Sequence, residues 1–147
     1  MRELRYQSGN ELKDFNCLYR EMDKIYHELA IKAGMSDSAF YILYAIVEMG
    51  DGCLQKEISE RYSLSKQTVN SSIQNLKSKS YISLVQGKGH DKHIHLTDAG
   101  QQFVKEAILP VMEMENAALL EMPLNERQEL LRLTKKYIQL FHKKTEQ

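Results

Sequence analysis

The 147-residue sequence has no tryptophan, only two prolines and only two cysteines, Cys17 and Cys53. Two cysteines are too few for a disulfide framework or for a zinc site built on cysteine. No apolar run approaches the roughly 18 residues of a membrane-spanning helix, and the first residues lack the apolar core of a secretory signal. The length fits one compact domain, and the absences predict that this domain works in the cytoplasm.

Recurrent catalytic motifs are missing as well. The sequence has no Walker loop, no glycine-rich dinucleotide fingerprint, no nucleophile elbow and no HExxH pair. Gly87 and Gly89 stand between two β-prone runs and open no helix, so they predict a turn. His93 and His95 share one strand face, whereas zinc needs three or four convergent ligands. The sequence therefore predicts no enzyme, no cofactor and no metal.

Charge is balanced over the chain, with 20 lysines and arginines against 20 acidic residues, but it is unevenly distributed. Residues 54–97 hold seven cations and three anions, a net charge of +4, and three of the five histidines. The rest holds 13 cations and 17 anions, a net charge of −4. Such a chain can present its basic side to nucleic-acid phosphates, although an uneven solvated surface explains the charges equally well.

Two apolar stripes predict long helices near the two ends of the sequence. The first follows spacings of three and four and ends before the stop signal Gly34; its members are Leu12, Phe15, Tyr19, Met22, Tyr26, Leu29 and Ala33. The second lies on a last helix after Pro123 and comprises Leu130, Leu133, Tyr137, Leu140 and Phe141. Asn125 and Gln128 have the spacing of a capping box for this helix. Pro110 should kink or break the helix that precedes it.

The segment 54–97 is the most informative part of the sequence. Apolar residues at helical spacing predict a short helix over 54–62, and Ser65 can cap a second helix after a tight turn. The inward face of that second helix is formed by Val69, Ile73 and Leu76. The β-prone runs 81–85 and 93–96 flank a glycine-containing turn and predict a hairpin. A helix, a turn, a helix and a hairpin make a winged helix-turn-helix.

In order and spacing, these pieces resemble the MarR family of bacterial transcription regulators. The resemblance rests on LQKEISERYSLSKQTVNSSIQNLKSKSYI, on HIHLTDAG, and on long helices at both flanks. LTDAG is similar to the family's LTxxG exit from the wing. The resemblance implies a mainly α fold with a small β wing, formed by one domain over 1–147. A winged lobe at 36–97 would be flanked by dimerisation helices at 10–34 and 98–145.

The resemblance also implies a homodimer that reads a pseudo-palindromic operator in double-stranded DNA. By position, the expected contacts on the second helix are Ser65, Lys66, Gln67, Thr68, Asn70 and Ser71, with Gln74 on the same face. The amides of Gln67 and Asn70 suit adenine, and Lys66 suits a phosphate. Plain solvent exposure is the alternative explanation for each of them.

On the wing, Lys88, His90 and Lys92 are expected to lie against phosphates or in the minor groove. Family wings usually carry an Asp-x-Arg pattern, whereas this sequence has Asp91-Lys92-His93. Lysine does not replace arginine in a narrow groove. We therefore expect wing contacts that are weaker and directed more toward phosphates.

The terminal stripes are the candidates for dimerisation, because the two recognition helices of a dimer must lie about one DNA turn apart, roughly 34 Å. The residues proposed for this role are Leu12, Phe15, Tyr19, Tyr137, Leu140 and Phe141. Burial in the chain's own core is the alternative for part of each stripe.

Regulation remains open at the level of sequence. The resemblance implies a repressor whose operator affinity is changed by a small-molecule effector. A crevice lined by Tyr19, Met22, Tyr26, Tyr41 and Tyr44 is one candidate site for the effector. An ordinary aromatic core explains the same residues. Two other functions stay open: a helical interaction or adaptor protein without DNA, and a redox-sensing regulator that uses Cys17.

Overall fold

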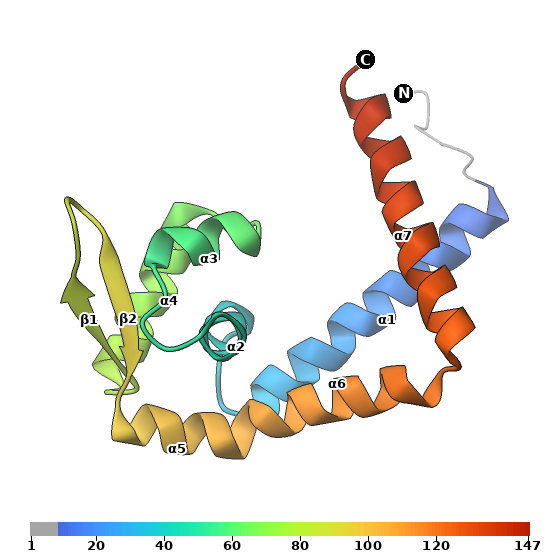
Figure 1. Cartoon of the computed structure of the whole chain (residues 1–147). Helices are drawn as coiled ribbons and strands as arrows, with labels where there is room; N and C mark the ends of the chain where they lie inside the picture. The colour runs from blue at the N-terminus through green and yellow to red at the C-terminus, as the bar shows by residue number, and fades with distance from the viewer. Residues whose placement is uncertain (1–8) are drawn as a thin grey trace, which may run out of the picture. The chain divides into compact units, whose positions relative to one another are not determined.

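The computed structural model describes residues 9–147 (Figure 1); residues 1–8 of the predicted domain lie outside the described residues. Residues up to Ile108 form one compact unit, and Leu109–Gln147 form a second. The first unit contains α1 (Asn10–Lys32), α2 (Asp37–Met49), α3 (Gln55–Arg61), α4 (Lys66–Ser78), β1 (Ile82–Gln86), β2 (Lys92–Leu96) and α5 (Asp98–Ala107). The second contains α6 (Leu109–Glu121) and α7 (Leu124–Thr145). The expected fold class, mainly α with a small β wing, is confirmed.

Helix α2 provides the centre of the first unit and packs against α1 and α4. Its buried face includes Phe40, Ile42, Leu43 and Ile46. Helix α4 contributes the predicted inward residues Val69, Ile73 and Leu76, each at most 1% exposed. Because α4 buries this apolar stripe, its polar stripe is held outward at a fixed orientation.

Three helices of this unit begin at a hydroxyl cap, as predicted. Ser36, Ser65 and Thr97 accept hydrogen bonds from the backbone N–H groups three residues further on, those of Ala39, Thr68 and Gly100. Each cap satisfies a backbone donor that the first helical turn leaves without a partner. The caps therefore fix where α2, α4 and α5 start.

Strands β1 and β2 pair antiparallel with Ile82 opposite Leu96 and form the wing. The other edge of β2 is tied to the segment before α3. Gly52 N–H donates to the Ile94 carbonyl at 2.8 Å, and Ile94 N–H donates to the Cys53 carbonyl at 2.9 Å. Asp51 accepts the Leu96 N–H at 2.7 Å. These bonds anchor the base of the wing to the helical part of the unit.

The predicted helix across Pro110 is interrupted. Helix α5 ends at Ala107, and α6 begins at Leu109. Proline has no N–H to donate and its ring crowds the preceding turn, so the expected kink or break is confirmed.

The predicted capping box at Asn125 is wrong, because α7 already begins at Leu124 and has no side-chain cap. Pro123, with an extended ψ of 150°, precedes the first turn, in which Arg127 N–H donates to the Pro123 carbonyl at 3.0 Å.

Helices α1 and α7 both expose apolar side chains. Only Ala30 is buried on α1, and α7 has no buried residue. The exposed fraction is 60% for Tyr19, 59% for Phe141 and 49% for Leu140. A long helix whose apolar stripe is exposed lacks most of the packing that normally stabilises it. Among residues 9–147, no helix is long and apolar enough to cross a membrane.

Candidate nucleic-acid interface

The outward face of α4 is polar, carries a cation and has no acidic residue. Its sequence, KQTVNSSIQNLKS, contains no aspartate or glutamate. The structure exposes the side chains that the sequence placed there: Lys66, Gln67, Asn70, Ser71 and Gln74. A helix with this surface can approach base edges in a major groove without electrostatic repulsion from the phosphates.

Ser65 and Thr68, which the sequence also assigned to DNA contact, are engaged with each other. The Ser65 hydroxyl donates to Thr68 Oγ1 at 2.8 Å and accepts the Thr68 N–H at 3.1 Å. Thr68 is half-buried, whereas Ser65 is exposed. Their first role is to hold the start of α4, and their contact with DNA stays a prediction.

The wing tip is a tight turn that presents cations. Asp91 N–H donates to the Lys88 carbonyl at 3.0 Å, and the Gln86 amide donates to the Gly89 carbonyl at 2.7 Å. Gly89 has a φ of +60°, which a residue with a side chain rarely adopts. With the turn closed in this way, Lys88, His90 and Lys92 are all exposed, as the sequence predicted.

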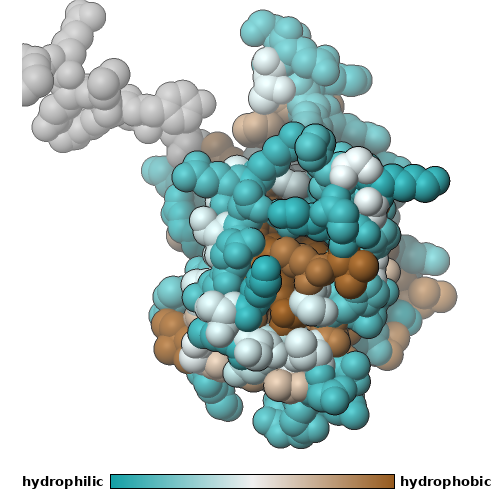
Figure 2. All heavy atoms as spheres, turned by 90° about the vertical axis from the view of Figure 1, so that its left-hand side faces the viewer, coloured by the Kyte–Doolittle hydropathy of each residue, from teal (hydrophilic) through white to brown (hydrophobic). Residues whose placement is uncertain are grey.

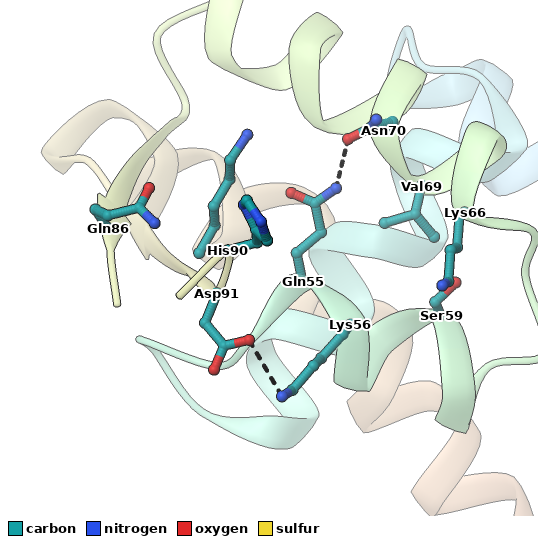
Figure 3. A pocket seen from close by; sticks show the side chains of 10 residues that line it. Gln55, Lys56, Ser59, Lys66, Val69, Asn70, Gln86, His90 and Asp91 are labelled. Atoms are coloured by element: carbon teal, nitrogen blue, oxygen red, sulfur yellow. Dashed lines mark hydrogen bonds and ion pairs between the residues drawn. The ribbon is translucent and has the colours of Figure 1, made fainter. Parts of the chain in front are cut away.

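The acidic residue of the wing is paired with a cation of α3. Asp91 Oδ1 lies 3.1 Å from Lys56 Nζ (Figure 3). Asp91 is half-buried, so its charge is directed to Lys56 and away from the tip. Lys88, His90 and Lys92, which carry donor groups, are therefore the part of the wing that a phosphate would meet first.

A cavity of about 520 Å³ lies between α3, α4 and the wing. Val69 is the apolar residue of its lining; the other residues are Gln55, Lys56, Ser59, Lys66, Asn70, Gln86, His90, Asp91 and Lys92. On the face of the molecule that carries the wing, Figure 2 shows an apolar patch enclosed by hydrophilic side chains. The candidate interface is therefore a concave surface with mostly polar side chains, with α4 on one side and the wing on the other.

Sequence reasoning missed Gln55 and Lys56 as members of this surface. Gln55 Nε2 donates to Asn70 Oδ1 at 2.6 Å, so the first turn of α3 reaches the exposed face of α4. The available signal was weak: two polar residues at the start of a helix whose N-cap, Leu54, has no capping side chain. Which residue of α4 they would contact depends on tertiary packing.

His93 and His95 have structural partners. His93 Nδ1 donates to the Gly52 carbonyl at 2.8 Å, and His95 Nδ1 lies 3.5 Å from Asp51 Oδ2. Both contacts hold the wing to the segment that precedes α3. Among residues 9–147, no three histidine, cysteine or acidic side chains group as metal ligands would.

The two cysteines differ in environment. Burial, followed by the charges of Glu57 and Asp51, raises the pKa of Cys53 to about 11. Little thiolate forms near neutral pH at such a pKa, so Cys53 is a poor nucleophile. Cys17 is exposed on α1, and redox sensing through it stays a prediction.

Comparisons with known proteins agree with this geometry. Residues 33–92, from the end of α1 to the start of β2, match a model of the MarR family. This segment is similar to the MarR family. The resemblance noted in the sequence is thereby confirmed. A search of curated proteins returned no match.

Solved structures extend the similarity beyond residues 33–92. A MarR family regulator from Neisseria meningitidis has 19% identity, covers 93% of this chain and 96% of its own, and gives a TM-score of 0.74. Staphylococcus aureus MepR in complex with DNA has 21% identity, coverages of 92% and 99%, and a TM-score of 0.69. Staphylococcus aureus MarR with salicylate and kanamycin has 19% identity, coverages of 90% and 90%, and a TM-score of 0.69. At these identities the likeness shows the fold.

The predicted effector crevice is only partly assembled within the first unit. The rings of Tyr26 and Tyr41 lie 5.9 Å apart between α1 and α2. Tyr44 is half-buried on α2, whereas Tyr19 and Met22 are more than half exposed on α1. An effector at these residues stays a prediction.

Proposed function

We propose that this protein is a sequence-specific DNA-binding transcription regulator that binds a pseudo-palindromic operator as a homodimer. The observation that carries the proposal is the outward face of α4, which has no acidic residue and lies beside a cation-bearing wing. The MarR-family match of residues 33–92 supports it, as does the DNA complex of Staphylococcus aureus MepR, which has the same fold.

In this proposal α4 enters the major groove and the wing lies on the adjoining backbone. Gln67 and Asn70 provide amide groups for base edges, and Lys66 binds a phosphate near the start of the helix. Lys88, His90 and Lys92 provide phosphate contacts from the wing. Phosphate contacts supply affinity and register, whereas the amides supply sequence preference.

The exposed apolar residues of α1 and α7 support the proposed homodimer. Leu133, Leu140 and Phe141 recur at helical spacing and are 51%, 49% and 59% exposed. Burial of such a stripe against a second copy removes apolar surface from water and stabilises the helix. Two copies also provide the two recognition helices that an inverted repeat requires.

We further propose that the protein represses transcription by occupying its operator, and that a small effector changes operator affinity. Staphylococcus aureus MarR, which has a similar fold, forms a complex with salicylate and kanamycin. An effector acts only if it binds one spacing of the two recognition helices more tightly than another. The aromatic residues between α1 and α2 are the proposed place for it.

A gel shift with random duplex pools in low-salt buffer tests DNA binding directly. The proposal predicts retarded complexes whose abundance falls steeply as salt rises, because bound lysines displace counterions from DNA. An adaptor protein that does not bind DNA would leave the pool unshifted at every protein concentration. Measurement of turnover does not separate these two functions, because neither is an enzyme.

Replacing both reading amides should remove base preference while leaving the fold intact. The double variant Gln67→Ala and Asn70→Ala should prefer its operator over random DNA about tenfold less than the original protein, because both base-edge pairs are lost. Competition binding with operator and random duplexes measures this ratio. Both side chains are exposed, so the variant should stay folded and keep its oligomeric state. Loss of folding alongside loss of preference would count against this role.

Lys88→Ala should weaken binding to every duplex alike. The lysine lies at the wing tip, where it meets a phosphate in the proposed complex, so its loss removes about one released counterion. The slope of log affinity against log salt should fall by about one unit. Lys105→Ala on α5 is a control for removal of one surface cation. An effect of Lys88→Ala restricted to certain sequences would contradict a phosphate contact.

A further inference from the structure

The amide of Asn70 is held by a neighbour that is itself partly buried. Gln55 Nε2 donates to Asn70 Oδ1 at 2.6 Å, between the first residue of α3 and the exposed face of α4. Gln55 is half-buried in the cavity, whereas Asn70 is exposed (Figure 3). A restrained side chain beneath an exposed one can fix the orientation of the exposed group.

The surroundings of Gln55 favour the observed orientation of its amide. Gln55 Oε1 is buried and accepts no hydrogen bond from the described residues. In Figure 3 this oxygen points toward the side of the cavity that carries His90, away from Asn70. Lys92 also lines this cavity. The reversed orientation would bury two N–H groups where Oε1 now lies, and buried N–H groups without a partner are rarer than unsatisfied carbonyl oxygens, so Nε2 on the side of Asn70 is favoured.

The hydrogen bond decides which part of Asn70 is offered to DNA. An asparagine pairs with adenine through two atoms, because Oδ1 accepts from N6 while Nδ2 donates to N7. With Oδ1 engaged by Gln55, the carboxamide offers mainly its N–H groups. The guanine edge presents two acceptors in the major groove, N7 and O6, whereas cytosine presents only a donor.

We infer that Gln55 is a specificity-determining residue that acts through Asn70, which it orients to read an acceptor-bearing edge, preferably guanine. The inference rests on the proposed DNA-binding function and specifies its base preference. It replaces the adenine pairing expected for Asn70 from the sequence alone. Gln55 itself is a positioning residue and need not touch the base.

Three variants and a selected operator test the inference. The position read by Asn70 is identified as the one at which Asn70→Ala loses its base preference. At that position, Gln55→Met should lower the preference for guanine about fivefold or more, because the shape is kept and the restraint is lost. Gln55→Glu offers only acceptors, so Asn70 must turn its N–H groups inward and its oxygen outward. At the position read by Asn70, this variant should prefer adenine or cytosine, whose edges carry donors.

The outcomes separate this inference from the function on which it rests. Failure of the original protein to select any duplex would overturn the proposed function, and the inference with it. Selective binding with the same preference in all three Gln55 forms would overturn the inference alone. If the Gln55 variants lose base preference at a position other than the one read by Asn70, the inference is also overturned, because Gln55 would then read a base directly. Unchanged melting temperatures show that the variants are folded.

Discussion

Gly100→Ala is expected to destabilise the fold by about 3 kcal/mol or more, the upper range for a substitution that overfills a packed site. A Cβ atom at this position would overlap the carbonyl oxygen of Tyr81 and lie 2.9 Å from its carbonyl carbon. The melting temperature should fall by about 6–12 °C at a fixed protein concentration. Thermal unfolding followed by circular dichroism measures the change.

The Tyr81 carbonyl cannot move away easily, because its surroundings hold it on several sides. It accepts the Thr97 N–H at 3.0 Å, and Tyr81 N–H donates to the Leu76 carbonyl at 3.0 Å. The Tyr81 ring also stacks on Phe103 with centroids 4.7 Å apart. Helix α5 therefore approaches the start of the wing closely, and only glycine leaves room for the carbonyl.

Gly9→Ala is the matched control for this substitution. No heavy atom lies within 4 Å of the Cβ that alanine would add there, and the φ of Gly9 is −62°. This variant should melt within about 2 °C of the original protein, as surface substitutions usually do. A Gly100→Ala protein as stable as the control would mean that α5 does not pack on Tyr81.

Leu133→Lys combined with Leu140→Lys is expected to convert the homodimer to a monomer and to weaken operator binding about a hundredfold or more. Two charges in the centre of a buried apolar stripe would remain unpaired, at a high desolvation cost. A monomer carries one recognition helix, so it loses the gain from binding two half-sites at once. Sedimentation velocity should then report the 17.1 kDa chain instead of twice that mass.

Gln128→Lys with Gln139→Lys adds the same charge to the opposite face of α7 and serves as the control. Both glutamines are exposed and lie away from the stripe that contains Leu133 and Leu140. The control protein should stay dimeric and keep its affinity. If the leucine variant is as dimeric as the control, the stripe on α7 is not the dimer interface.

The features that could be predicted from the sequence are those set by local chemistry. Helical spacing gave the inward face of α4, hydroxyl residues gave three helix starts, and Pro110 gave the interruption between α5 and α6. The predicted start of α7 was wrong. Asn125 has a side chain that can cap a helix, but α7 begins at Leu124 and no side chain caps it. Local patterns suffice where one residue type satisfies one backbone requirement.

Contacts between distant segments could not be predicted from the sequence. LTDAG was noted as a motif, but its need for glycine at position 100 arises from a carbonyl 19 residues earlier in the chain, at Tyr81. The bond between Gln55 and Asn70 likewise joins two helices whose packing no periodicity reports. Such contacts depend on how elements pack, and they decide the shape of the candidate site.

Selection of bound duplexes from a random library, followed by sequencing, tests the central claim most directly. A homodimer with two α4 helices should enrich an inverted repeat whose half-sites lie about one helical turn apart, roughly 34 Å. Enrichment of a single unrepeated half-site, or no enrichment at all in low-salt buffer, would contradict the account.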